Sequence, residues 1–241
     1  MKAVLQTNAT GKIHILLYHQ VGTTPDEHTN LDCFCDSKEF YKQMRFLKES
    51  HYKIISLNQA VELILNKGVI DKHYVVLTFD DGCEKFYDTA FPVLEALAFP
   101  STIYPVVNCL GKHATWGNLK NPALKILSRS MVTELCKLGV EIGAHTMDHV
   151  KLTRVDRYEA VKQVNESKKT LEQLTGSKVS SIAYPHGDFN QESIEIVQAA
   201  GFSNALTCIA DTAEQAKSAY EIPRKYITYY DDLNQFKKKL L

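Results

Sequence analysis

Two acidic residues stand at the end of an apolar run. Asp80 and Asp81 follow residues 75–79 and precede Gly82. Sites in parallel α/β folds form at the carboxyl ends of strands, where paired carboxylates suit acid–base chemistry or metal binding. Adjacent strand residues point to opposite faces, so both acids reach one cavity only if the chain turns, which Gly82 favours. The alternative interpretation is an ordinary polar turn.

A pair of histidines gives the second chemical signal. His145 and His149 also follow a strand-like run, residues 140–143. Histidines four positions apart lie on one face of a helical turn, so we expect both imidazoles to converge on one divalent cation. With an aspartate they make a set of two histidines and one carboxylate that leaves positions open for water and substrate. A single histidine would more simply be structural, but this spacing favours a metal site.

Two further segments end at the same predicted edge. His19 ends the run 13–18, where a structural hydrogen bond and an acid catalyst are equally good interpretations. A second run is followed by Tyr184, Pro185, His186 and Gly187, which by default form a loop. Beside a metal, this rigid turn could present the backbone N–H of Tyr184 to a developing oxyanion.

Strand-like and helix-like patterns alternate along the chain, which favours a parallel sheet or barrel flanked by helices. Short apolar runs rich in β-branched and aromatic residues predict buried strands at 13–18, 74–79, 101–107, 140–143 and 181–184. Helical spacing gives three apolar faces, formed by Phe40, Met44 and Leu47, by Tyr87, Phe91 and Leu94, and by Val164, Leu171 and Leu174. The least regular stretches, 20–36 and 108–121, are candidate walls of a substrate groove.

Local signals predict where several helices begin and end. Ser56 and Gln59 have the spacing of a capping box, and Gly68 follows the helix that they would start. Gly176 and Gly201 stand where later helices should end. No repeat or Gly/Ser/Pro-rich boundary divides the chain, so we expect one domain over residues 1–241.

Composition excludes several classes of function. The chain has 28 basic and 28 acidic residues, so it lacks the electrostatic footprint of a nucleic-acid binder. No apolar stretch is long enough for a transmembrane helix, and residues 1–11 lack the apolar core of a secretory signal, so we expect a cytoplasmic protein. The six cysteines are scattered and are expected to be free thiols. A structural zinc site through Cys33 and Cys35 is the less favoured alternative.

Taken together, these segments resemble the polysaccharide deacetylases with a NodB-type domain, carbohydrate esterase family four. Thr78-Phe79-Asp80-Asp81-Gly82 is similar to the first motif of that family, His145-Thr146-Met147-Asp148-His149 to the second, and Ala183-Tyr184-Pro185-His186-Gly187 to a variant of the third. The likeness covers roughly residues 13–230. It implies an α/β fold with a single distorted (β/α)7 barrel, similar to a TIM barrel. It also implies Asp81, His145 and His149 as ligands of a divalent metal, zinc before others, and Asp80 as general base.

The chain departs from the family pattern in two ways. The third motif lacks the arginine that contacts the base, and no histidine follows His186, so the usual late catalytic histidine is missing. The start Tyr18-His19-Gln20 resembles a permuted subgroup that includes bacterial poly-N-acetylglucosamine deacetylases, in which the acid histidine lies near the N-terminus. Arg224 could replace the missing arginine, or it could be an exposed surface residue.

The resemblance and the residues together predict a metal-dependent hydrolase that removes N-acetyl groups from an amino-sugar-containing glycan or glycoconjugate. Asp80 would deprotonate the attacking water, and His19, or failing it His186, would protonate the leaving amine. Trp116, the only tryptophan, could stack on a sugar ring or pack in the core. The other candidates are a small-molecule amide or O-acetyl ester hydrolase and a degenerate glycan-binding protein. A phosphatase is disfavoured because it would not need the paired histidines.

Overall fold

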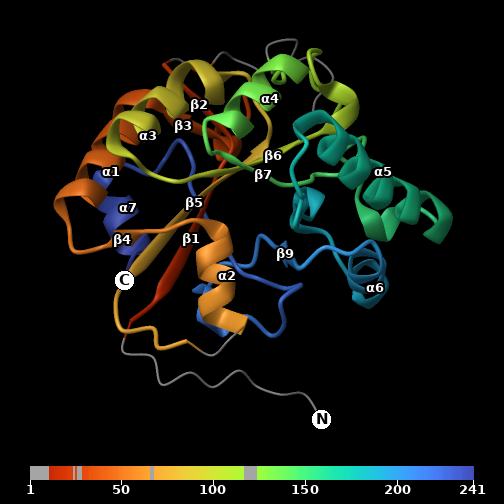
Figure 1. Cartoon of the computed structure of the whole chain (residues 1–241). Coiled ribbons are helices and arrows are strands. Elements are labelled where there is room, and N and C mark those ends of the chain that lie inside the picture. The colour runs from red at the N-terminus through yellow and green to blue at the C-terminus, as the bar shows by residue number, and fades with distance from the viewer. Residues whose placement is uncertain (1–10, 24, 26–28, 66–67, 117–123) are drawn as a thin grey trace.

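Parallel strands form the centre of the molecule, and helices surround them (Figure 1). The computed structural model describes residues 11–23, 25, 29–65, 68–116 and 124–241. The largest sheet has the order β10-β1-β5-β6-β7, and β4 pairs with the start of β5. Its strands are β1 (Ile13–Tyr18), β4 (Lys53–Ile54), β5 (Tyr74–Asp81), β6 (Thr102–Pro105), β7 (Glu141–Ile142) and β10 (Lys225–Tyr226).

A second, two-stranded sheet completes the barrel. It pairs β8 (Ser181–Ala183) with β9 (Asn204–Leu206), again in parallel. A bridge between Ala144 and Ile182 links it to the chain after β7, and a bridge between Leu206 and Ile222 links it to the chain before β10. Strands β1 and β5 to β10 therefore form the distorted (β/α)7 barrel that the sequence predicts, closed at two places by single bridges instead of full ladders.

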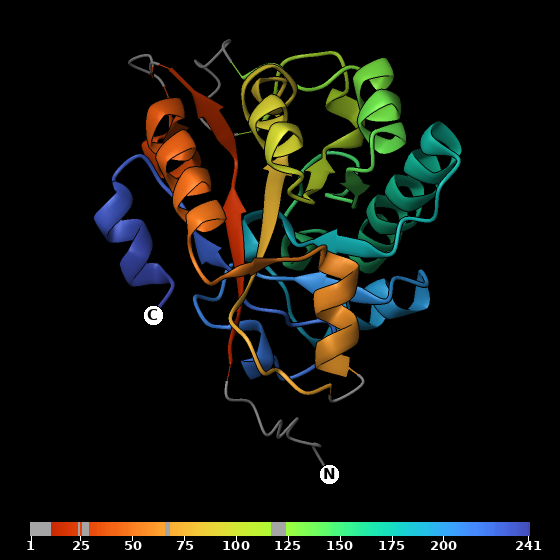
Figure 2. The same ribbon diagram turned by 60° about the vertical axis from the view of Figure 1, so that its left-hand side comes forward.

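The helices lie outside the strands, and α1, α3, α4 and α5 follow one another around the barrel (Figure 2). The α-helices are α1 (Ser37–Glu49), α2 (Leu57–Leu65), α3 (Phe91–Leu97), α4 (Arg129–Lys137), α5 (Arg157–Thr175), α6 (Gln191–Ala199) and α7 (Leu233–Lys239). A π-helix, Phe86–Ala90, precedes α3, and 3-10 turns occur at Leu31–Cys33, Val107–Cys109, Leu152–Arg154, Pro185–Gly187 and Ala213–Gln215. No helix of the described residues is both long and apolar enough to cross a membrane.

Alternate side chains of β5 point to opposite faces of the strand and pack into two separate parts of the core. Val75, Leu77 and Phe79 join the larger apolar cluster, which includes the buried faces of α1, α3, α4 and α5. Val76 joins a smaller cluster with residues of β1, β8 and β9 and of α2. Side chains two apart on a strand share a face, so Thr78 and Asp80 continue the row of Val76 toward the end of the strand. A polar site therefore begins where this apolar row ends.

The local sequence signals are largely confirmed. The predicted strands occur within two residues of their expected ends. The backbone nitrogen of Ser56 donates to the side chain of Gln59, and the backbone nitrogen of Gln59 donates to the side chain of Ser56, as in a capping box. Gly176 caps α5 in the left-handed region, with φ 69°. All six cysteines are free, as expected.

One of the two stretches predicted to be irregular contains regular structure. Residues 20–36 include strands β2 (Gln20–Gly22) and β3 (Phe34–Asp36), which pair in parallel. Each strand has only three residues, which is too few to show a strand pattern in the sequence. The other stretch is 108–121, and its residues 117–121 lie outside the described residues. Residues 1–10 of the N-terminal segment 1–11 also lie outside them.

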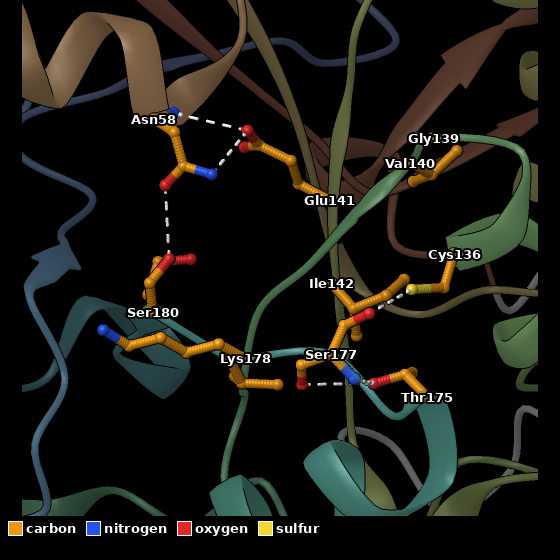
Figure 3. Close-up of a pocket in the computed structure, with 12 residues that line it drawn as sticks. Asn58, Cys136, Gly139, Val140, Glu141, Ile142, Thr175, Ser177, Lys178 and Ser180 are labelled. Atoms are coloured by element: carbon orange, nitrogen blue, oxygen red, sulfur yellow. Dashed lines mark hydrogen bonds between the residues drawn. The ribbon is translucent and has the colours of Figure 1, made fainter.

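The seam between β7 and β8 is spanned by side chains. Glu141 on β7 accepts hydrogen bonds from the backbone and side-chain nitrogens of Asn58 at 3.4 and 2.8 Å, and Ser180 donates to the side-chain oxygen of Asn58 at 3.2 Å (Figure 3). Asn58 therefore joins the start of α2 to both strands. The pocket that these residues line contains none of the acids and histidines with predicted chemistry.

Close packing at this seam predicts a large cost for one added methyl group. A Cβ at Gly143 would lie 2.1 Å from Cε1 of Tyr104, whose ring is fully buried and has no space to move. Gly143→Ala should lower the free energy of unfolding by about 3 kcal/mol, measured by urea denaturation. Gly201→Ala is the control, since that position has open space and φ 76°, and it should cost only about 1 kcal/mol. Equal losses for the two variants would contradict this account.

Candidate metal centre

Three predicted residues meet at the carboxyl end of β5. Asp81 is the last residue of β5, and His145 and His149 belong to the loop after β7. All three are buried, and their ligand atoms lie within 4.8 Å of one another. The Oδ1 atom of Asp81 is 3.5 Å from Nε2 of His145 and 3.3 Å from Nε2 of His149. The structure thus brings together the carboxylate and the two imidazoles that the sequence singles out.

The protonation pattern of these groups fits a cation. Nδ1 of His145 must donate its proton to the carbonyl of Ala183, 2.8 Å away, so a neutral ring has its lone pair on Nε2. Oδ1 of Asp81 is buried and lacks a hydrogen-bond partner among the described residues. Burial alone would raise the pKa of Asp81, but the two imidazoles hold that pKa well below its usual value. The ionised oxygen and the Nε2 atoms of both rings face one space, which is the donor set that a transition metal requires.

The loop that presents the histidines is not the helical turn that their spacing suggests. Thr146 and His149 have positive φ values of 64° and 58°, which belong to the left-handed region. A right-handed turn through residues 145–149 is therefore ruled out. The histidines still converge, because the two left-handed residues fold the loop back on itself.

The hydrogen bonds of Gln163 on α5 hold this loop in place. Its side-chain oxygen accepts from the backbone nitrogens of Met147 and Asp148 at 3.0 and 2.9 Å, and its nitrogen donates to the Asp148 carboxylate at 2.7 Å. Asn108 donates to the other carboxylate oxygen of Asp148, also at 2.7 Å. The sequence analysis missed Gln163. The signal for it in the sequence is a polar residue within the mainly apolar buried face of α5, one position before Val164.

Asp80 lies beside the metal centre but has a different partner. Nη1 and Nη2 of Arg224 donate to its two carboxylate oxygens, each at 2.7 Å. Arg224 is fully buried, so the interpretation of it as an exposed surface residue is wrong. Burial would raise the pKa of Asp80, but the guanidinium outweighs it, together with His145, and keeps that pKa below its ordinary value. Asp80 is therefore a carboxylate at neutral pH.

His19 faces the same region from the end of β1. Its Nε2 lies 3.1 Å from the hydroxyl of Tyr226, a residue that the sequence analysis missed, and its Nδ1 is buried with no hydrogen-bond partner among the described residues. Burial lowers the pKa of His19, while Asp81 and Asp80 act in the opposite direction. Burial is the larger effect and the pKa of His19 is lowered from its ordinary value, so the two aspartates only partly restore the charged form that a general acid needs.

Aromatic rings line another side of the centre. The ring of His149 lies 4.4 Å from the ring of Trp116 and 4.4 Å from that of His186, measured between centroids. His186 is exposed, yet partial desolvation, with the charge of His149, lowers its pKa to about 4. It is thus neutral at pH 7.

The predicted oxyanion donor needs a correction. The backbone N–H of Tyr184 donates to the carbonyl of Leu206 at 3.1 Å, because the β8–β9 ladder extends one residue beyond the strand. That amide is therefore engaged and cannot serve a substrate. Pro185 has no N–H, and Gly187 donates to the carbonyl of Tyr184 at 2.9 Å. The amide of His186 is the remaining backbone donor of this segment.

Comparison with known proteins agrees with this arrangement. The family model described as polysaccharide deacetylase matches residues 67–205, which include both aspartates and both histidines. The chain belongs to the polysaccharide deacetylase family. The match ends before Arg224 and begins after His19, so these two residues lie outside the part of the family that the model describes.

Relatives and solved structures extend this likeness over most of the chain. A poly-beta-1,6-N-acetyl-D-glucosamine N-deacetylase of Staphylococcus aureus is 26% identical over 232 residues, covering 88% of this chain and 78% of the relative. The deacetylase PplD of Streptococcus pyogenes has a TM-score of 0.83 at 21% identity, with 95% of this chain and 98% of PplD covered. IcaB of Ammonifex degensii has a TM-score of 0.81 at 22% identity, covering 97% and 99%. The chain therefore shares its barrel fold with PplD and IcaB.

The role of Gln163 in this deacetylase-family site can be tested by metal binding. Gln163→Ala removes the acceptor for two loop amides, so it should weaken zinc binding by about 10- to 100-fold, as loss of outer-shell support typically does. Titration against a competing chelator measures this affinity. Gln191→Ala, on the exposed face of α6, is the matched control and should bind zinc as the unmodified protein does. An unchanged affinity in Gln163→Ala would mean that the loop holds its shape without this residue.

Proposed function

We propose that this protein is a metal-dependent deacetylase that hydrolyses the N-acetyl group of an amino sugar within a glycan or glycoconjugate and releases acetate. The observation that carries the proposal is the juxtaposition of Asp81, His145 and His149, with their lone pairs facing one space, and a second carboxylate held by Arg224 beside them. Membership of the polysaccharide deacetylase family supports the same reaction.

Asp81, His145 and His149 are the proposed metal ligands. The donor set of one carboxylate and two imidazoles suits zinc and leaves positions for water and substrate, so we propose zinc as the metal. A bound divalent cation would polarise the acetamide carbonyl and lower the pKa of a water molecule beside it. The Oδ1 atom of Asp81 supports this assignment: it is buried, the Nε2 atoms of His145 and His149 lie 3.5 and 3.3 Å away, and neither contact has the geometry of a hydrogen bond, which is costly for an anionic oxygen unless a cation is bound.

Asp80 is the proposed general base. Arg224 occupies one direction at each carboxylate oxygen, and each oxygen retains a second lone pair that can accept a proton from water. The ion pair also fixes the carboxylate plane, so the base needs no reorientation during the reaction. Because its pKa is lowered, Asp80 is a weak base and can deprotonate only a water molecule whose own pKa is lowered. A metal ion beside Asp80 would lower the pKa of such a water molecule.

The remaining steps involve His186 and His19. The backbone N–H of His186 is the proposed donor to the oxyanion that forms when water attacks the acetyl carbon. His19 is the proposed acid, which protonates the sugar amine as the carbon–nitrogen bond breaks. Its unpartnered Nδ1 supports this role, since that nitrogen is free of protein partners within the described part of the chain.

The substrate class is proposed from the site and the relatives. The S. aureus relative is named for a polymer of N-acetyl-D-glucosamine, so we propose N-acetylglucosamine as the sugar whose acetyl group is removed. We propose that Trp116, whose ring lies close to that of His149, stacks on a ring of the sugar substrate. The cytoplasmic location stays a prediction. In the cytoplasm, a nucleotide-linked, lipid-linked or short sugar would be a more reachable substrate than a cell-wall polymer.

Acetate release tests the function directly. With zinc present, the protein should release acetate from N-acetylglucosamine oligomers, and a chelator should abolish the release until zinc is restored. A panel of O-acetylated sugars and simple acetamides should react more slowly. Faster turnover of the acetamides or esters would replace the proposal with a small-molecule hydrolase, and metal-dependent glycan binding without acetate release would indicate a binding protein.

The two adjacent aspartates should behave differently when each is changed. Asp81→Ala removes a ligand, so zinc content and activity should fall together. Asp80→Asn keeps all three metal ligands but removes the base and the anion that balances Arg224, so the protein should still bind zinc, with reduced stability, and kcat should fall by about 100- to 10,000-fold. Zinc per protein, measured by atomic emission, and initial rates of acetate release separate the two outcomes. Asp88→Asn, an exposed neighbour, is the control; near-normal activity in Asp80→Asn would remove Asp80 from the mechanism.

A further inference from the structure

A chain of side chains from three separate segments leads to His19. The hydroxyl of Tyr226 lies 3.1 Å from Nε2 of His19 and 3.2 Å from Sγ of Cys33. The rings of Tyr226 and His19 are in contact, with centroids 4.9 Å apart. Tyr226 ends β10, and Cys33 ends a 3-10 turn in the loop between β2 and β3. None of the proposed roles uses Tyr226 or Cys33.

The backbone fixes this arrangement. In the parallel β1–β10 pair, Tyr226 stands opposite Leu17, and the nitrogen of Ile227 donates to the carbonyl of Leu17 at 2.9 Å. His19 is two residues beyond Leu17, so the ladder sets the distance between the phenol and the imidazole. The nitrogen of Tyr229 donates to the carbonyl of Leu31 at 3.0 Å, which ties the turn that contains Cys33 to the same strand end.

Donor and acceptor chemistry determines how these groups must be oriented when His19 is charged. A protonated imidazole carries hydrogens on both nitrogens, so Nε2 donates and the oxygen of Tyr226 must accept. The hydroxyl hydrogen of Tyr226 then has to point elsewhere, and the sulfur of Cys33 is within hydrogen-bond distance. Burial raises the pKa of Cys33 to about 12, so it stays a thiol whose sulfur is an acceptor without a full charge.

We propose that Tyr226, supported by Cys33, is a positioning residue that stabilises the charged form of His19 and reserves Nδ1 for proton transfer to the leaving amine. This inference rests on the proposed deacetylation. Nδ1 delivers its proton to the amine nitrogen as the carbon–nitrogen bond breaks, and the ring then remains neutral with its hydrogen on Nε2, still donated to Tyr226. The contact with Tyr226 is thus kept before and after the transfer, so the ring does not have to rotate.

Other groups also act on His19, and the test must leave them unchanged. They are the carboxylates of Asp81 and Asp80, which favour its charge, and the cations Arg224 and His145, which oppose it. Replacing the phenol hydroxyl of Tyr226 removes no charge and no metal ligand. A change in the behaviour of His19 in that variant therefore reports the hydrogen bond.

The experiment combines an NMR titration with kinetics on the zinc-loaded full chain. In Tyr226→Phe the charged imidazole loses its acceptor, so the pKa of His19 should fall by about one unit, the size expected for one hydrogen bond to a charged group. The alkaline limb of the kcat profile should move to lower pH by the same amount, because activity requires protonated His19. At neutral pH kcat should fall about tenfold while KM changes less than twofold. His19→Ala assigns the NMR signals.

Matched variants separate positioning from folding. Tyr229→Phe removes a hydroxyl three residues away, outside the hydrogen-bond chain, and should leave His19 unchanged. Cys33→Ser retains an acceptor for Tyr226 and should keep the pKa of His19 and kcat close to their normal values. Cys33→Ala removes that acceptor and should shift both in the direction of Tyr226→Phe, by a smaller amount. Zinc content and melting temperature should match those of the unmodified protein in all of these variants.

Two results would overturn the inference. One is a pKa of His19 that is the same in Tyr226→Phe as in the unmodified protein, and the other is a normal kcat profile in a variant whose His19 pKa has moved. If Cys33→Ser and Cys33→Ala had the same pKa of His19 and the same kcat, Cys33 would have no part in positioning Tyr226. The NMR titration needs no substrate. If the protein released no acetate, the proposed function would be rejected, but the titration would still test the hydrogen bond between Tyr226 and His19.

Discussion

The buried ion pair between Arg224 and Asp80 is the interaction on which the rest of the site depends. Arg224 is fully buried and cannot lose its charge, so its burial is tolerable only beside an anion with matching geometry. The pair joins the end of β5 to the chain just before β10, across the interior of the barrel. Removal of either partner would leave an unpaired buried charge, at a cost of about 3 to 5 kcal/mol. The same contact therefore helps to close the barrel and orients the proposed base.

Backbone strain marks the same place in the molecule. Among described residues other than glycine, five have positive φ, and four of these belong to the site: Asp81, Thr146, His149 and His186. Each such residue costs of order 1 kcal/mol or more, and it persists only where the surroundings determine its conformation. The loop of His145 and His149 has such surroundings. Gln163 on α5 and Asn108 in the Val107–Cys109 turn make five hydrogen bonds to the centre of this loop. The energy stored in the loop is thus offset by packing that lies outside it.

Local pattern was enough to predict five strands, namely β1, β5, β6, β7 and β8, along with most helices and the identity of the clustered residues, because periodicity and the ends of parallel strands are short-range properties. Strands β2, β3, β4, β9 and β10 were not predicted. Local pattern was also not enough to predict partners that depend on closure of the barrel. Arg224 lies 144 residues from Asp80, and Tyr226 lies 207 residues from His19, so neither pair leaves a signal in local spacing. The helical turn expected for the two histidines was wrong for a related reason, since tertiary contacts decide the backbone of a short loop. The amide of Tyr184 was assigned wrongly because the β8–β9 ladder continues past the strand.

Two neighbouring residues of the same type acquire different chemistry because the end of β5 sends them to different surroundings. Asp80 continues the inward row of Val76 and Thr78 and meets a permanent cation, so protein groups already balance its charge. Asp81, with φ 69°, turns toward two imidazoles that are not permanent cations, so its charge is not balanced by the protein. A divalent cation on Asp81 would leave one positive charge in excess beside a neutral Asp80–Arg224 pair. That excess would stabilise negative charge developing on the substrate, which is the direction of charge flow in amide hydrolysis.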